Sequence, residues 1–234
     1  MKMVRIEMPR KEWTPFDNRV FTHVLKKLQG KSSAALYFYL YDEAYHSGLG
    51  IVTKTASRLA HLTGMDARVT KTSLDELKDR GLIYNASEGI PRSRTQTDTW
   101  VVSHTGLDLK KGGWTPVPRI VIHKYIRRFP NAVLLPLLLF HQHKSWRNEC
   151  WVGVAKLSEL LNWSKTRVRG ALRRMIQDDE WTSRRTGLPR PLTFTVKKKD
   201  GKRSRHYRVL AVSYSKEKKK SERTVGISPR FQEL

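Results

Sequence analysis

Basic side chains are concentrated on one predicted helix in the second half of the chain. From Ser164 to Met175 the sequence has five bases and no acid. The bases are Lys165, Arg167, Arg169, Arg173 and Arg174. The apolar residues at helical spacing are Val168, Ala171, Leu172 and Met175. This apolar stripe should face a core, so the bases should cover the outer face, where lysine and arginine can bind phosphate.

The start of this helix has the features of a base-reading and phosphate-binding site. Ser164 can cap the helix, and the backbone N–H groups of a capped N-terminus favour an anion. Arg167 and Arg169 lie near that end, where an arginine can donate two hydrogen bonds to a guanine edge. Thr166 immediately precedes Arg167 and belongs to the same candidate set, whereas the later bases are expected to contact phosphate.

The same apolar spacing occurs 98 residues earlier (157 − 59 = 98). The matched pairs are Leu59 with Leu157, Leu74 with Leu172 and Leu77 with Met175. A fixed period of this kind predicts two copies of one supersecondary unit. Each copy is predicted to be a helix, a short polar turn and a second helix, the arrangement that places a helix in a DNA major groove.

The second helix of the first copy, expected over 66–80, has balanced charge. Its bases are Arg68, Lys71, Lys78 and Arg80, and its acids are Asp66, Asp75, Glu76 and Asp79. The candidates for DNA contact in its first half are Arg68, Thr70, Lys71 and Ser73. This helix is therefore expected either to read bases or to contact a protein.

Each copy is followed by a predicted pair of strands, at 82–84 and 100–102 and then at 192–196 and 206–212. Asp200-Gly201 between the later strands is a strong hairpin signal. The basic residues that we expect to reach DNA from these two wings are Arg92, Arg94, Lys198, Lys199, Lys202, Arg203 and Arg205. Apolar helices are expected over 33–46 and 131–143, the second starting late or kinked because of Pro136.

The pattern divides the chain into two blocks, each opened by Trp-Thr-Pro, with a linker at 110–113. We therefore expect a mostly α protein with small β-hairpin wings, an α+β fold of two tandem winged-helix domains related by the internal repeat. The expected domains are 1–112 and 113–214. Residues 215–234 are expected to form a flexible basic tail or, alternatively, to carry a docking peptide.

The overall charge predicts a polyanionic partner. The chain of 234 residues has 46 Lys and Arg against 21 Asp and Glu, a net charge of +25. Such an excess most often indicates nucleic acid. The single cysteine, Cys150, and the lack of a secretory or membrane-spanning pattern predict a cytoplasmic protein that does not use a membrane.

No catalytic, metal or cofactor motif is visible, so we expect a protein that is not an enzyme. His141-Gln142-His143 is similar to the His-hydrophobe-His ligand pair of rolling-circle nicking initiators, although its middle residue is Gln. Residues two apart on a helix point about 200° apart. Since the surrounding apolar pattern predicts a helix, His141 and His143 should not share a metal.

From the two matched units and the Asp200-Gly201 wing, most of 13–213 resembles the tandem winged-helix replication initiators of plasmids and phages. The resemblance implies binding of repeated origin sites, control of copy number and recruitment of a host helicase or primase. The leading hypothesis is a sequence-specific double-stranded DNA-binding protein of this kind.

A transcriptional regulator with the same fold is the first alternative. The second is an accessory DNA-binding subunit of a larger nucleoprotein complex, contacting its protein partner through the first winged helix or the C-terminal peptide. RNA binding and the oligomeric state are left open by the sequence.

Overall fold

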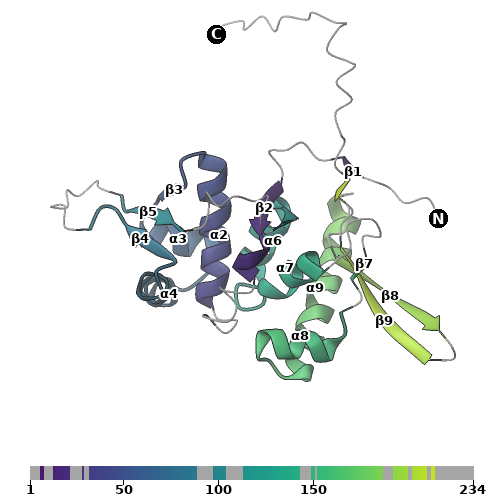
Figure 1. The fold of residues 1–234 in the computed structure, drawn as a ribbon. Helices are drawn as coiled ribbons and strands as arrows, with labels where there is room; N and C mark the ends of the chain where they lie inside the picture. The colour runs from purple at the N-terminus through teal and green to yellow at the C-terminus, as the bar shows by residue number, and fades with distance from the viewer. Residues whose placement is uncertain are drawn as a thin grey trace, which may run out of the picture.

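The computed structural model describes residues 6–7, 13–21, 28, 32–88, 97–103, 113–142, 149–150, 152–186, 192–199, 202–209 and 212–213. Helices dominate these residues and the sheets are small, which confirms the α+β class (Figure 1). The helices are α2 (Ser32–Ser47), α3 (Ala56–Thr63), α4 (Ala67–Asp79), α6 (Arg119–Arg128), α7 (Leu134–Gln142), α8 (Val154–Leu161) and α9 (Lys165–Thr186).

The strands form four small sheets. They are β1 (Ile6–Glu7), β2 (Trp13–Asp17), β3 (Ile51–Thr53), β4 (Ile83–Asn85), β5 (Thr99–Val102), β6 (Trp114–Pro118), β7 (Glu149–Cys150), β8 (Leu192–Lys199), β9 (Lys202–Val209) and β10 (Val212–Ser213). Strands β1 and β10 pair in parallel, and the other pairs are antiparallel.

The internal repeat is visible in the elements themselves. Helices α3 and α8 have eight residues each and begin 98 positions apart (154 − 56), and α4 and α9 begin at the same offset (165 − 67). The turns match as well, because Gly64 and Asn162 both have left-handed backbone, with φ of 66° and 51°. In each unit a short strand before the two helices joins two strands after them in a three-stranded sheet, ordered β3-β5-β4 and β7-β9-β8.

Most helix boundaries agree with the sequence-based expectation, including the late start of α7 that Pro136 imposes. The apolar spacing also predicts helices over about 154–161 and 164–177. Helix α8 has the predicted bounds, but the predicted end of α9 was wrong, since the helix continues to Thr186. The segment from Ala171 to Thr186 contains neither glycine nor proline, and Gly187 is the first residue after Gly170 that disfavours a helix.

The two Trp-Thr-Pro segments pair with each other, which the sequence pattern did not predict. Strands β2 and β6 are antiparallel with Pro15 opposite Pro116, and the Trp13 and Trp114 rings stack with centroids 5.2 Å apart. The register is symmetric about the two prolines, so the repeated segment contacts its own copy through a local two-fold axis. The same geometry joins identical subunits in an isologous dimer.

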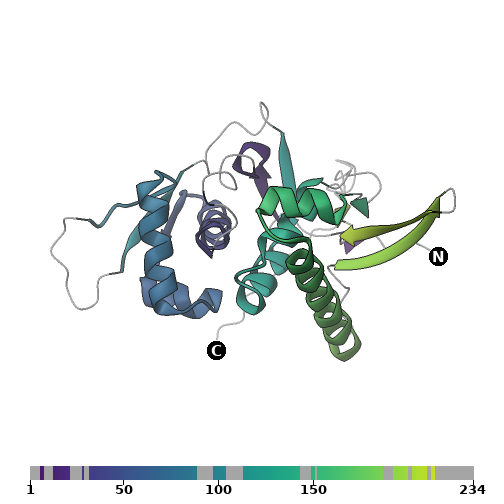
Figure 2. The same cartoon turned by 90° about the horizontal axis from the view of Figure 1, so that it is seen from below.

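The two halves also share their apolar core. A single buried cluster contains Leu59 and Leu77 from the first unit together with Leu172 and Met175 from the second. The β4–β5 pair and the β8–β9 hairpin lie at opposite ends of the molecule (Figures 1 and 2). The halves are therefore packed against each other, and the later strands of each unit project outward. The domain boundary between residues 112 and 113 stays a prediction.

Gly64 is the position where this packing depends most on one residue. A Cβ atom there would lie 2.6 Å from the backbone carbonyl oxygen of Arg127, and φ is +66°. Gly81 has the same φ with nothing within 4 Å of its Cβ position. We expect Gly64→Ala to lower the free energy of unfolding by about 2–3 kcal/mol and Gly81→Ala by about 1 kcal/mol. Urea unfolding would measure both, and equal losses would contradict the tight contact.

Candidate nucleic-acid interface

The turn between α8 and α9 is rigidly built. Asn162 ends α8 in left-handed backbone, and its N–H donates to the carbonyls of Ser158 and Glu159. The N–H of Trp163 donates to the Ser158 carbonyl oxygen at 3.0 Å, and the Ser158 hydroxyl donates back to the carbonyl of Trp163. Ser164 Oγ then accepts from the N–H of Arg167 at 3.2 Å, so the predicted cap is confirmed.

The first ten residues of α9 present a basic surface. The inward residues are buried as predicted: Val168, Ala171, Leu172 and Met175. The six exposed candidates are Lys165, Thr166, Arg167, Arg169, Arg173 and Arg174. Among the residues that the structure describes, none forms an ion pair with any of the five bases. The outer face of this segment therefore has a net positive charge and unused hydrogen-bond donors.

The acids farther along α9 are used to attach the helix to α6. Asp179 is buried and accepts hydrogen bonds from the Tyr125 hydroxyl and the Lys124 ammonium group. Burial, together with the charge of Asp179, raises the pKa of Tyr125 well above its ordinary value, so Tyr125 stays a donor. Asp178 pairs with Lys124 and Arg128. These contacts fix the later part of α9, while its start remains exposed.

In the first unit, the structure corrects two of the four candidates on α4. Arg68 and Lys71 are exposed, but Thr70 and Ser73 are buried, at 0% and 4% exposure. Thr70 donates its hydroxyl hydrogen to the Asp66 carbonyl oxygen at 3.0 Å. Both residues occupy the inward stripe with the leucines, so neither is available to DNA in this structure.

The N-terminus of α4 differs electrostatically from that of α9. Asp66 caps α4, its carboxylate accepting from the Arg68 N–H at 2.8 Å. A carboxylate at this position interacts favourably with the helix dipole and repels a phosphate, whereas Ser164 in the second unit is neutral. On α4 itself three acids offset three bases. The interface features are therefore concentrated on α9.

The wing residues are placed only in part. Strands β8 and β9 pair over eight positions, from Leu192 opposite Val209 to Lys199 opposite Lys202. The antiparallel pairing confirms a pair of strands here, but β8 extends past the predicted 196 to Lys199, and β9 spans Lys202–Val209 where 206–212 was predicted. Residues 200–201 lie outside the described part. Lys198, Lys199, Lys202, Arg203 and Arg205 are in these strands, with side chains that are not described. Arg92, Arg94 and the tail 215–234 also lie outside the described residues.

A buried polar junction joins the halves behind this surface. Asp42 in α2 is fully buried and accepts from Thr14, while Arg119 and His123 of α6 lie 3.1 and 2.8 Å from its Oδ2. Burial, the largest influence, raises the pKa of Asp42. The hydrogen bonds and nearby positive charges outweigh it and leave that pKa below its ordinary value of 3.8. Burial also lowers the pKa of the adjacent His46.

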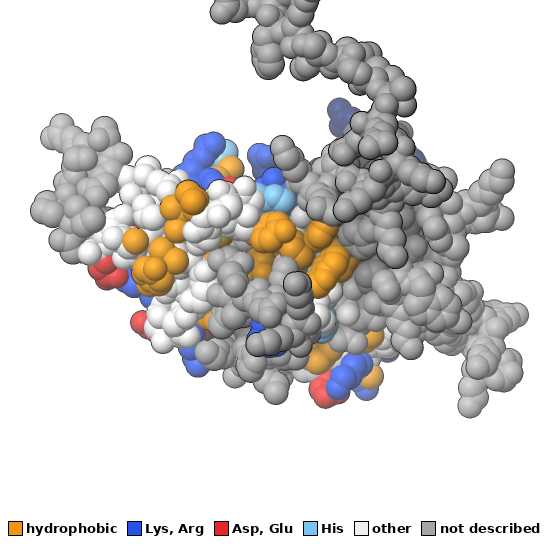
Figure 3. Space-filling view, turned by 45° about the horizontal axis from the view of Figure 1, so that its top comes forward, with side chains coloured by type: hydrophobic (Ala, Val, Ile, Leu, Met, Phe, Trp, Pro, Cys, Tyr) orange, Lys and Arg blue, Asp and Glu red, His pale blue; other side chains and the backbone are white. Residues whose placement is uncertain are grey.

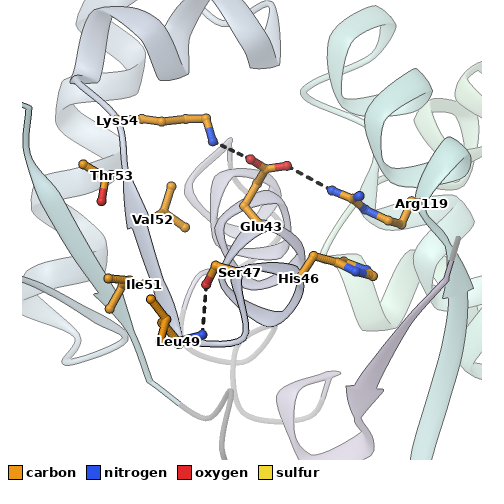
Figure 4. A pocket seen from close by; sticks show the side chains of 9 residues that line it. All are labelled: Glu43, His46, Ser47, Leu49, Ile51, Val52, Thr53, Lys54 and Arg119. Carbon is orange, nitrogen blue, oxygen red and sulfur yellow. Dashed lines mark hydrogen bonds and ion pairs between the residues drawn. The ribbon is translucent and has the colours of Figure 1, made fainter. Parts of the chain in front are cut away.

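The junction opens onto a pocket of about 370 Å³. In Figure 4, Glu43 points between Lys54 and Arg119 and pairs with both, the distance to Arg119 being 3.1 Å. Asp42, Glu43 and His123 bring ligand-type atoms within 4.8 Å of one another. Because the two carboxylates already bind Arg119, we interpret the group as an ion-pair network that joins the halves.

His141 has a packing role in the structure. Its ring stacks on Phe21 with centroids 4.4 Å apart, and Nδ1 lies 3.0 Å from the Thr115 hydroxyl. Burial lowers its pKa. His141 and Gln142 lie on helix α7 as expected, and His143 lies outside the described residues.

Exposed apolar side chains are scattered over the described surface. The large ones are Leu49, Val69, Tyr84, Trp114, Ile120 and Trp181. On the face in Figure 3, apolar groups gather near the middle, and the described Lys and Arg side chains are dispersed around them. That face differs from the start of α9, where five exposed bases fall within ten residues.

Comparison with protein-family models and with curated proteins found no match to this sequence. Within the described part of the chain, no helix is long and apolar enough to cross a membrane. The functional inference therefore depends on the geometry above.

Sequence reasoning missed two features of this region. The guanidinium of Arg167 lies over the Trp163 ring, with its central carbon 4.1 Å from the ring centroid. The sequence signal for this contact was the spacing of four residues between Trp163 and Arg167 at the start of a helix, where such side chains can meet. The Asp42 junction joins residues about 80 positions apart, and no local pattern indicates it.

Proposed function

We propose that the protein binds double-stranded DNA sequence-specifically, with α9 entering a major groove. The observation that carries this proposal is the exposed basic start of α9, capped by Ser164, whose bases form no ion pair with a described residue. Backbone N–H groups at the capped end favour phosphate, and the arginines supply donors for base edges and phosphates. The net charge of +25 supports the same class of partner.

We further propose that the chain consists of two winged-helix units. The support is the common element order, which is a short strand, two helices and two further strands. The three strands form a sheet in which the last strand lies in the middle. In the second unit the β8–β9 hairpin is the wing, with basic residues at its far end. A wing of this composition fits an adjacent phosphate run or a minor groove.

We propose replication initiation on a mobile element as the biological role, because most of residues 13–213 resemble the tandem winged-helix replication initiators of plasmids and phages. Copies of the bound sequence arranged as direct repeats beside the gene would support it. A single copy overlapping a promoter would support a transcriptional regulator instead. A footprint restricted to one groove segment, with α4 contacting protein, would support the accessory-subunit alternative.

Selection of bound duplexes from a random pool tests the DNA-binding proposal. We expect a defined motif whose affinity exceeds that of a scrambled duplex by about 10³-fold or more at physiological salt. Footprinting on that motif should show two contacted major-groove segments about one helical turn apart. Equal binding of selected and scrambled duplexes would refute sequence recognition, and preferential competition by structured RNA would redirect the proposal to RNA.

A further inference from the structure

Arg167 differs from the other bases of α9 because its side chain has a fixed support. Its guanidinium lies over the Trp163 ring, with the central carbon 4.1 Å from the ring centroid. Trp163 is only 6% exposed and belongs to the buried core. The Trp163 N–H donates to the carbonyl oxygen of Ser158, and the Trp163 carbonyl accepts from the Ser158 hydroxyl, so both bonds hold the backbone that carries the ring.

The stacking leaves the recognition groups of Arg167 available. A guanidinium stacks through its flat face, while its N–H donors point outward in its plane. Within the described residues, nothing accepts a hydrogen bond from this side chain. An arginine supported on a ring, with donors that no described residue uses, suits the two acceptors of guanine, O6 and N7, in the major groove.

The internal repeat shows that the fold does not require this support. The positions equivalent to Ser158, Trp163 and Arg167 are Ala60, Met65 and Val69, each 98 residues earlier. The first unit forms the same left-handed turn and the same helix start with these residues. The Ser158–Trp163–Arg167 arrangement is therefore additional to what the turn needs.

We propose that Trp163 is a positioning residue that holds Arg167 to read one guanine in the major groove. Arg169, Arg173 and Arg174 are exposed without an aromatic support among the described residues and act on phosphate. The inference rests on the DNA-binding function proposed above. Among the arginines of α9 it assigns guanine recognition to Arg167, where the sequence pattern left both Arg167 and Arg169 as candidates.

The test compares two duplexes, the selected one and a copy with the candidate guanine pair changed to adenine–thymine. The ratio of their Kd values is measured for wild type, Arg167→Lys, Arg169→Lys, Trp163→Met and Trp163→Phe. Lysine keeps the positive charge but lacks the planar guanidinium, whose paired N–H groups can donate to two acceptors. Methionine is the residue that the first unit has at this position, and phenylalanine keeps a ring. Circular dichroism melting confirms that each variant is folded.

We expect Arg167→Lys to lower the guanine preference by about ten- to a hundredfold and Arg169→Lys to leave it unchanged. Trp163→Met should lower the preference by about two- to fivefold, and Trp163→Phe should retain most of it. In the Trp163 variants, affinity for the adenine-substituted duplex should stay the same. A merely structural role of Trp163 would instead weaken binding to both duplexes equally.

The outcomes separate the two proposals. If wild type enriches no motif from a random pool, the DNA-reading function fails and this inference fails with it. If a motif is enriched, an unchanged guanine preference in Arg167→Lys overturns the inference alone. Equal weakening of both duplexes by Trp163→Met overturns the positioning role of Trp163.

Discussion

Replacing Arg169, Arg173 and Arg174 together with glutamine should weaken binding to every duplex and flatten its salt dependence. Each phosphate contact contributes about 0.9 to the slope of log Kobs against log salt concentration, so loss of three should reduce the slope by about 2.7. All three side chains are exposed and unpaired among the described residues. Glutamine is a good helix former, so α9 should remain folded.

A matched variant on α4 provides the control for this result. Replacing Arg68, Lys71 and Arg80 with glutamine removes the same number of exposed charges from the first unit. We expect a smaller change in slope, because α4 begins with the Asp66 carboxylate and has balanced charge. Fluorescence anisotropy over a series of salt concentrations measures both variants. A larger change for the α4 variant would mean that the first unit is the main DNA contact.

Replacing Asp42 with asparagine should destabilise the whole protein. Asp42 is fully buried and bound by groups from both halves, so its loss leaves Arg119 paired only with Glu43 among the described acids. Removing one member of a buried ion pair costs about 3–5 kcal/mol. We expect about 3 kcal/mol, since Arg119 is 32% exposed and water compensates part of the loss. For a chain of this length, that corresponds to a melting temperature lower by about 6–12 °C.

The same variant has a defined pH dependence. Because the pKa of Asp42 in the folded protein lies below 3.8, its contribution to stability is present above pH 3.8. The contribution is lost as the pH falls through the lower folded-state pKa. The stability difference between wild type and Asp42→Asn should therefore narrow in acid, and a constant difference would mean that the carboxylate charge is not what stabilises the junction.

A surface ion pair supplies the control for the Asp42 experiment. Glu180, with a side chain 39% exposed, pairs with Arg184 at 2.6 Å one turn along α9. Glu180→Gln should change the free energy of unfolding by less than about 1 kcal/mol, because exposed pairs are weak. Urea unfolding compares the two substitutions directly.

The helices could be predicted largely from local signals. Thr55 and Asp66 cap α3 and α4 as their side chains suggest, and α8 has the bounds that its apolar spacing predicts. Strands β2 and β6 could not be found in this way. Both contain proline, which cannot donate to a ladder, and they pair across about 100 residues.

The candidate site was predicted in outline but not residue by residue. The exposed bases of α9 follow from its apolar stripe, and the same reasoning applied to α4 places Thr70 and Ser73 inward with Leu74 and Leu77. Their polarity had suggested a DNA contact, but small hydroxyl side chains can be buried when they bond to the backbone, as Thr70 does.

Guanine methylation interference on the selected duplex tests most directly whether α9 reads a major groove. Methylation at N7 blocks the acceptor that an arginine uses in that groove. The account predicts that one methylated guanine prevents binding by the wild type, and that Arg167→Lys loses this sensitivity. Interference only from adenine N3 methylation in the minor groove, or from no base at all, would contradict it.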